Sequence, residues 1–213
     1  MFPILAGYNV TVNKRRNLNK TQNSAPKGSA VSINKAAKPT ITSLIADLAS
    51  KDGIIRVKAR RQLVAYKARS VAPLIKTLSN ENDWVRWEAA KALSQIANPA
   101  SIQALLEALS DKTFEVRWLA AEGLAQIGRK AVVPLVETLV EHSDSLWLRE
   151  SIHHVLHDMN RGRLSDILRP VLVALESNEP SLEVPLAARG ALDGLNKRGP
   201  LQINNSQFGV ALL

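Results

Sequence analysis

The 213-residue chain contains no cysteine, few aromatic residues and no long apolar run. The absence of cysteine excludes a disulfide framework, thiolate metal ligands and a cysteine nucleophile. No apolar run approaches the roughly 18 residues that a membrane-spanning helix needs, so we predict no transmembrane segment. The chain also lacks Gly-x-Ser-x-Gly, Walker and dinucleotide-binding motifs. We therefore expect no cofactor and no catalytic residues, and we favour a non-enzymatic protein over an enzyme.

Acidic residues are missing from one end of the chain. Residues 1–39 contain seven Lys and Arg and no Asp or Glu, and residues 1–69 contain fourteen Lys and Arg against two Asp, a net charge of +12. Residues 70–213 carry a net charge of −3. Because residues 1–39 are also polar and without a helical or strand period, we predict that they form a disordered basic arm. We expect a cytoplasmic protein, with organellar import through the arm as the alternative.

An internal repeat organises the rest of the chain. The stretch VRWEAAKAL at Val85–Leu93 returns 31 residues later as VRWLAAEGL at Val116–Leu124, and related stretches begin at Ile55, Leu148 and Val184. A second apolar pattern with helical spacing precedes each of them. Repeats of about 30 residues made of two amphipathic helices are typical of an α-solenoid. We predict an all-α, right-handed α-solenoid of about five two-helix repeats over residues 40–196, followed by a C-terminal tail at residues 197–213.

The repeat resembles a known family. In this repeat an Asp or Asn is followed after four residues by Val-Arg, then by Ala-Ala and Leu, with Pro-x-Leu in the next helix. This pattern is similar to HEAT-type repeats, and more narrowly to the short variety named after phycobilisome chromophore lyases. The resemblance covers residues 40–196. It implies that the second helices line the concave side and that an acid ahead of each pairs with its Arg. Four repeats keep this Arg but only Asp111 supplies the acid, so we expect mostly neutral hydrogen bonds from Arg56, Arg86, Arg117 and Arg149.

All four tryptophans lie at one point of the repeat. Trp84 and Trp147 precede the apolar–Arg pair, whereas Trp87 and Trp118 follow it. Stacked repeats would bring these side chains into rows near the starts of the second helices. One interpretation is a recognition strip, because Trp and Arg are favoured at protein interfaces. The other is that each Trp packs over its own turn or over the neighbouring repeat.

We predict a partner-binding strip on the second helices of the first three repeats. Residues that lie off the buried stripe of these helices remain available to a partner. The strip would attract an acidic or amphipathic protein segment, because its charge is strongly positive at the first repeat. Its predicted residues are Lys58, Arg61, Trp87, Lys91, Trp118 and Glu122.

The leading functional hypothesis is therefore a protein–protein interaction scaffold. The resemblance adds a chromophore lyase, or a subunit of one, as an alternative. The basic end, with Lys58, Arg60, Arg61, Lys67 and Arg69, adds a second alternative, which is binding to nucleic acid or to an anionic surface.

Three histidines lie in the second helix of the fourth repeat. His153 and His157 are four residues apart and, with Glu150, have the spacing to reach one metal ion. His154 aligns with Lys91 and Glu122, which are polar positions of the repeat. We favour a solvated or packed histidine group and predict no metal site.

Overall fold

The computed structural model describes residues 38–197. Nearly all of the predicted basic arm and of the predicted tail lies outside this range, so these boundaries stay predictions. Within residues 38–197 the regular secondary structure is helical and no strand occurs, which confirms the predicted fold class. No helix among them is long and apolar enough to cross a membrane. The helices form five consecutive pairs: α1 (Ile41–Asp47) and α2 (Gly53–Ala65), α3 (Ala68–Thr77) and α4 (Asp83–Ile96), α5 (Ile102–Ala108) and α6 (Phe114–Ile127), α7 (Val132–Glu141) and α8 (Leu146–Met159), and α9 (Ser165–Leu175) and α10 (Pro180–Lys197).

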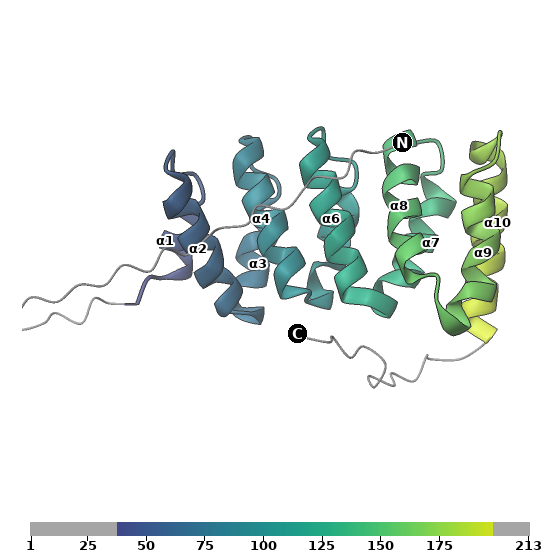
Figure 1. Cartoon of the computed structure of the whole chain (residues 1–213), viewed down its shortest axis with the longest axis horizontal. Coiled ribbons are helices and arrows are strands. Elements are labelled where there is room, and N and C mark those ends of the chain that lie inside the picture. The colour runs from purple at the N-terminus through teal and green to yellow at the C-terminus, as the bar shows by residue number, and fades with distance from the viewer. Residues whose placement is uncertain (1–37, 198–213) are drawn as a thin grey trace, which may run out of the picture. The chain divides into compact units, whose positions relative to one another are not determined.

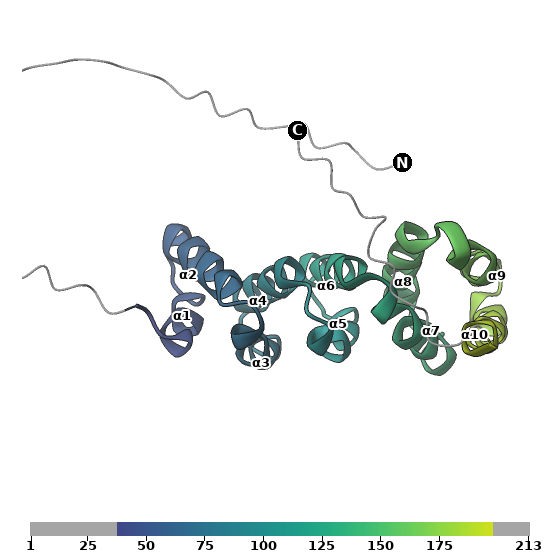
Figure 2. The same cartoon turned by 90° about the horizontal axis from the view of Figure 1, so that it is seen from below.

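The pairs stand side by side in one row of two layers (Figures 1 and 2). The second helices α2, α4, α6 and α8 form one layer, and the first helices α1, α3, α5 and α7 form the other. The last pair is reversed, because α9 packs against α8 while α10 packs against α7. The repeat alignment made Val184–Leu192, which lies in α10, the fifth copy of the second helix. In the structure α10 instead lies in the layer of first helices, against α7. The buried stripe of α10 (Val184, Ala188, Ala191 and Leu195) fits either layer, so the apolar pattern alone does not decide between them.

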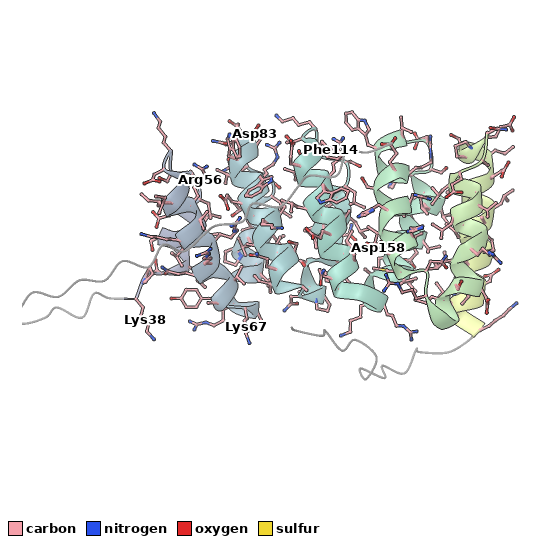
Figure 3. The ribbon with its side chains drawn as sticks, in the orientation of Figure 1. Lys38, Arg56, Lys67, Asp83, Phe114 and Asp158 are labelled. Carbon is pink, nitrogen blue, oxygen red and sulfur yellow. The ribbon has the colours of Figure 1, made fainter. Side chains whose placement is uncertain are left out.

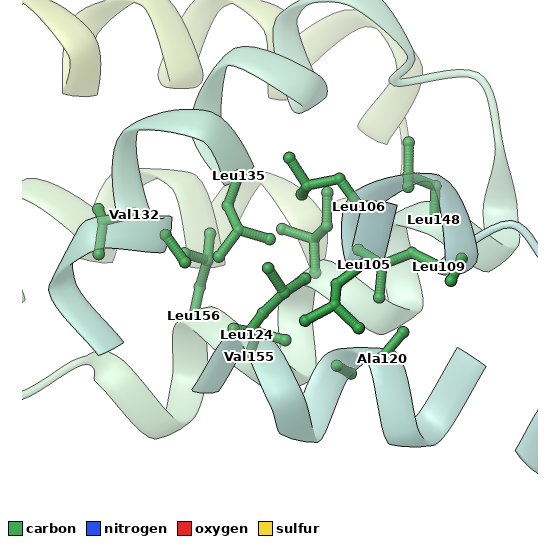
Figure 4. Packing of buried hydrophobic residues seen from close by; sticks show 14 of the residues in the cluster. Leu105, Leu106, Leu109, Ala120, Leu124, Val132, Leu135, Leu148, Val155 and Leu156 are labelled. Carbon is green, nitrogen blue, oxygen red and sulfur yellow. The ribbon is translucent and has the colours of Figure 1, made fainter. Parts of the chain in front are cut away.

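The core is built from the leucines that recur in the sequence. Figure 4 shows side chains of α5, α6, α7 and α8 packed between the two layers. Leu93 and Leu124, the last residues of the two best repeat copies, are fully buried. Small residues bring neighbouring second helices close together: a Cβ at Gly123 of α6 would lie 3.0 Å from Leu105 Cδ1 and 3.3 Å from the Cα of Ser94 in α4.

Within the described residues, one side of α2 in the first repeat is left uncovered. Three positions of α2 are exposed although the equivalent positions of α4 and α6 are buried against the preceding helix. Two of the three exposed side chains are polar and one is apolar. The exposed residues are Ile55, Lys58 and Gln62, and their buried equivalents are Val85, Glu88 and Ala92 in α4, and Val116, Leu119 and Gly123 in α6.

A residue with a positive φ follows each of the first three second helices. The residue four positions after the recurrent Leu has a positive φ in each case: 51° at Lys67, 49° at Ala97 and 72° at Gly128. The helix ends at each of them, but ψ differs: it is 42° at Ala97, and −128° and −140° at Lys67 and Gly128. Only the third repeat uses glycine, the residue that adopts such angles at no steric cost.

Candidate functional site

Side-chain caps hold the beginnings of the second helices in place. Asp52 and Asn82 accept a hydrogen bond from the backbone N–H two residues on, which starts α2 and α4. Just before these caps, the side chains of Ser50, Asn80 and Asp111 make the same kind of turn, as their position in the repeat predicts. Because the repeats stand side by side, the first turns of the second helices lie along one edge of the solenoid, where Figure 3 labels Asp83 and Phe114.

The recurrent arginine binds the turn in front of its own helix. In each of the first four repeats its Nη1 donates to the backbone carbonyl six residues earlier. These acceptors are neutral, as expected from the shortage of acids ahead of the second helices. The pairs are Arg56 with Ser50 (2.8 Å), Arg86 with Asn80 (2.9 Å), Arg117 with Asp111 (2.8 Å) and Arg149 with Ser143.

The same arginines also contact the following repeat, and the chemistry of this second contact differs from repeat to repeat. Two of them lie over tryptophan rings, which attract a cation through the negative charge of the ring face. The distances from guanidinium carbon to ring centroid are 5.6 Å for Arg56 and Trp84 and 4.5 Å for Arg117 and Trp147. Arg86 instead hydrogen-bonds both carboxylate oxygens of Asp111, at 2.7 and 3.0 Å, and Arg149 lies 3.5 Å from Ser181 Oγ.

The Arg86–Asp111 pair lies between α4 and the turn before α6, with side chains only 6% and 11% exposed. Burial opposes ionisation of Asp111, but hydrogen bonds from Arg86 and from the backbone of Thr113 outweigh it and hold the pKa of Asp111 below its ordinary value. The hydrogen bond to Asp111 raises the pKa of Arg86 in turn. Both groups are therefore charged near neutral pH, and the pair fastens the second repeat to the third.

A shallow depression of about 520 Å³, largely open to solvent, lies between α2 and α4. We call it the α2/α4 hollow. Its α4 side consists of Trp84, Trp87 and Glu88, and the two indole rings meet edge to face with centroids 6.5 Å apart. Its α2 side consists of Gly53, Ile54, Arg56, Val57, Lys58, Arg60 and Arg61.

Two of the four cations of the α2/α4 hollow are already paired. Glu88 is 2% exposed, with its oxygens 3.5 Å from Arg56 Nε and 3.1 Å from Arg60 Nη1. The Arg60 guanidinium also lies 5.5 Å from the centroid of the Trp87 ring. Lys58 and Arg61 are exposed and form no ion pair within residues 38–197. The hollow thus combines aromatic walls with two cations at its rim that are available to a ligand.

The six residues of the predicted strip fall into three groups along the second helices. Lys58, Arg61 and Trp87 line the α2/α4 hollow. Lys91 and Glu122 pair with each other across α4 and α6, with Nζ and Oε2 3.5 Å apart. Trp118 stacks on His154 of α8, with ring centroids 4.6 Å apart. Trp87, Lys91, Trp118 and Glu122 therefore all make contacts between repeats, while Trp118 keeps 47% of its surface exposed.

Three residues that line the α2/α4 hollow are missing from the predicted strip, although comparison of the repeats distinguishes each of them. Glu88 occupies the position of Leu119 in the next repeat, and a charge at a core position indicates a buried ion pair. Ile54 occupies the position of Trp84 and Trp147 at the start of the helix, and it is 66% exposed. Arg60 stands where the next two repeats have Ala90 and Ala121, and the larger side chain reaches both Glu88 and Trp87.

The histidines of α8 are divided among different contacts. His153 Nε2 lies 2.8 Å from Glu176 Oε1 at the end of α9, and His154 stacks on Trp118. The rings of His153 and His157 are 6.1 Å apart. Over the described part of the chain, no three His, Asp or Glu side chains gather in a way that could hold a metal ion.

A model of HEAT repeats matches two overlapping stretches, residues 41–118 and 102–193. The chain belongs to the HEAT-repeat family. This assignment confirms the resemblance seen in the sequence, and it agrees with the stacked helix pairs. HEAT-repeat solenoids are typical protein-interaction scaffolds, so the family makes binding the expected role of this chain and leaves the partner open. No curated protein matches the chain.

Several solved structures resemble this HEAT-repeat chain in fold. The complex of CpcE and CpcF of phycocyanin lyase from Nostoc sp. PCC7120 is 23% identical, with 81% of this chain and 71% of that chain covered and a TM-score of 0.44. An engineered protein is 22% identical, with coverage of 71% and 77% and a TM-score of 0.41. A designed armadillo repeat protein in complex with the peptide (KR)4 is 20% identical, with coverage of 78% and 95% and a TM-score of 0.37.

Proposed function

We propose that the protein is a non-enzymatic interaction scaffold that binds a protein partner on the face of its second helices. The partner segment is acidic and apolar, and it is held by Lys58, Arg61, Trp87, Lys91, Trp118 and Glu122. The observation that carries this proposal is the α2/α4 hollow, which combines two tryptophan rings with Lys58 and Arg61, two cations that form no ion pair within residues 38–197.

The hollow suits an apolar side chain flanked by carboxylates. Exposed aromatic rings offer a large contact area at low cost in side-chain entropy, and Trp and Arg dominate the binding energy of many interfaces. The ring edges of Trp84 and Trp87 and the side chain of Val57 supply the apolar surface. Lys58 and Arg61 at the rim would steer an acidic segment towards it and fix its register.

Charge reversal tests the proposal. The double variant Lys58→Glu with Arg61→Glu is compared with a control double variant, Lys76→Glu with Lys130→Glu. The control changes the net charge by the same amount at two exposed lysines away from the second helices, one in α3 and one just before α7. Both variants and the original protein are used to capture proteins from the native lysate, and each captured protein is then purified and titrated by calorimetry. We expect a direct partner whose affinity falls at least tenfold, about 1.4 kcal/mol, in the first variant only.

Two outcomes would contradict the proposal. One is a purified direct partner that binds both variants and the original protein equally well. The other is recovery of nucleic acid in place of protein, with binding that weakens steeply as salt is raised, since such a slope reports phosphate contacts. Circular dichroism of both variants before the titrations guards against unfolding as the cause of a loss.

A further inference from the structure

Exposed aromatic side chains also gather between α6 and α8. Phe114, Trp118 and Trp147 are 60%, 47% and 48% exposed. Arg117 connects them, with its guanidinium carbon 5.6 Å from the Phe114 centroid and 4.5 Å from the Trp147 centroid. Phe114 lies 6.3 Å from Trp118, which stacks on His154. These five residues form one continuous surface, which we call the α6/α8 cluster.

The α6/α8 cluster repeats the construction of the α2/α4 hollow two repeats further on. In both places the recurrent arginine of one repeat lies over a tryptophan of the following repeat. These tryptophans, Trp84 in α4 and Trp147 in α8, are each the second residue of their helix. The boundary between α4 and α6 is different. There Arg86 binds Asp111 and Lys91 binds Glu122, and Glu115 replaces the tryptophan. Two aromatic sites are thus separated by one ion-paired boundary.

We propose that the α6/α8 cluster is a second docking site for the partner segment that binds the α2/α4 hollow, and that this segment is an amphipathic helix with two apolar anchors and acids beside only one of them. The inference rests on the proposed function and adds to it the length, the spacing and the direction of the bound segment.

The spacing follows from the geometry of stacked helices. Neighbouring helices pack roughly 8–10 Å apart, so sites two repeats apart are about 16–20 Å from each other. In an α-helix, residues 11 positions apart are about 16.5 Å apart along the axis and lie within about 20° of the same face. Residues nine positions apart lie on opposite faces, about 180° from each other. A helix with anchors at positions i and i+11 therefore reaches both sites.

The direction follows from charge. The α2/α4 hollow offers Lys58 and Arg61, which have no ion-pair partner within the described residues. Exposed carboxylates stand at the helix starts of both sites, Asp83 in α4 and Glu115 in α6, but Arg117 of the α6/α8 cluster is already engaged by aromatic rings. Acidic residues are therefore more favourable at the anchor over α2 and α4, where Lys58 and Arg61 are available, than at the other anchor.

The test uses two helical peptides of identical composition. Each carries two leucine anchors and places its glutamates around the first, with the second anchor at i+11 in one peptide and at i+9 in the other. Calorimetric titration of the full chain measures both dissociation constants. We expect the i+11 peptide to bind at least tenfold more tightly, and we expect this difference to vanish in the variant Phe114→Ala with Trp147→Ala.

The control variant is Leu182→Ala with Leu186→Ala, which removes two side chains of similar exposure (65% and 67%) from α10 and should keep the difference. Equal binding of the two peptides by the original protein overturns the inference, and so does a difference that survives in the cluster variant. If the cluster variant does not fold, Phe114→Ala alone serves, with an expected reduction of at least threefold. Binding that responds to Lys58→Glu with Arg61→Glu but not to the cluster variant overturns the inference and leaves the proposed function standing. A failure of both peptides to bind also overturns the inference, whereas the proposed function is decided separately by the partner captured from the lysate.

Discussion

Lys67 holds a backbone conformation that suits glycine. Its φ and ψ of 51° and −128° resemble those of Gly128, 72° and −140°, at the same position of the repeat. Such angles cost a non-glycine residue roughly 1–3 kcal/mol, more than the roughly 0.5–1 kcal/mol that glycine adds in chain entropy. We expect Lys67→Gly to raise the free energy of unfolding by about 1 kcal/mol in urea denaturation. Lys76→Gly, inside α3, should lower it by about 1 kcal/mol. A destabilised Lys67→Gly variant would contradict the assigned turn.

Asp111 makes stability depend on pH. Its pKa in the folded state is lowered, so its contribution is complete above the unfolded-state pKa of about 3.9 and is lost as pH falls through the folded-state pKa. We expect Asp111→Asn to lower the free energy of unfolding at pH 7 by about 1–3 kcal/mol, because Arg86 loses a charged partner. The difference between variant and original protein should shrink as pH falls below about 4. Chemical denaturation across this range measures it, and a difference that grows towards low pH would contradict the account.

At the scale of the helix, the close approach of α6 to α4 depends on Gly123. A methyl group there would meet the Cα of Ser94 at 3.3 Å, and a backbone atom yields less readily than a side chain. We expect Gly123→Ala to lower the free energy of unfolding by about 1 kcal/mol, since overpacking costs roughly 1–3 kcal/mol and the gain in helix propensity is at most about 1 kcal/mol.

Gly190 provides the matched comparison. It is also inside a helix, but beyond its own turns of helix backbone no heavy atom among the described residues lies within 4 Å of the place its Cβ would take. Gly190→Ala should therefore raise the free energy of unfolding by about 0.5–1 kcal/mol. Thermal melts of both variants check the pair of predictions, and equal shifts in the two variants would show that packing at Gly123 is not limiting.

The sequence predicted the helices better than their placement. The recurrent stripe identified Leu93 and Leu124 as core residues, because burial repeats with the period of the helix. The same stripe did not reveal that α10 lies among the first helices, since an apolar face does not specify which neighbour covers it. The burial of Glu88 was missed for a related reason, because its arginine partners come from the preceding repeat and are invisible to a pattern read along one helix.

At the scale of the whole molecule, the candidate site is a product of stacking. Lys58 and Trp87 lie 29 positions apart in the sequence and meet in the α2/α4 hollow because α2 and α4 are neighbours in one layer. The sequence predicted this neighbourhood through the repeat. It did not predict which rings would be covered by arginines, which depends on side-chain conformations across the boundary between repeats.

All four tryptophans of the chain line either the α2/α4 hollow or the α6/α8 cluster, so their indole N–H signals report directly on the proposed surface. The deciding measurement is a nitrogen–proton NMR titration of the 15N-labelled full chain with the i+11 peptide, with each indole signal assigned by a single Trp→Phe substitution. The account predicts that the signals of Trp84 and Trp87 shift in proportion to the bound fraction, together with those of Trp118 and Trp147. Calorimetrically confirmed binding that leaves all four signals unchanged would contradict it.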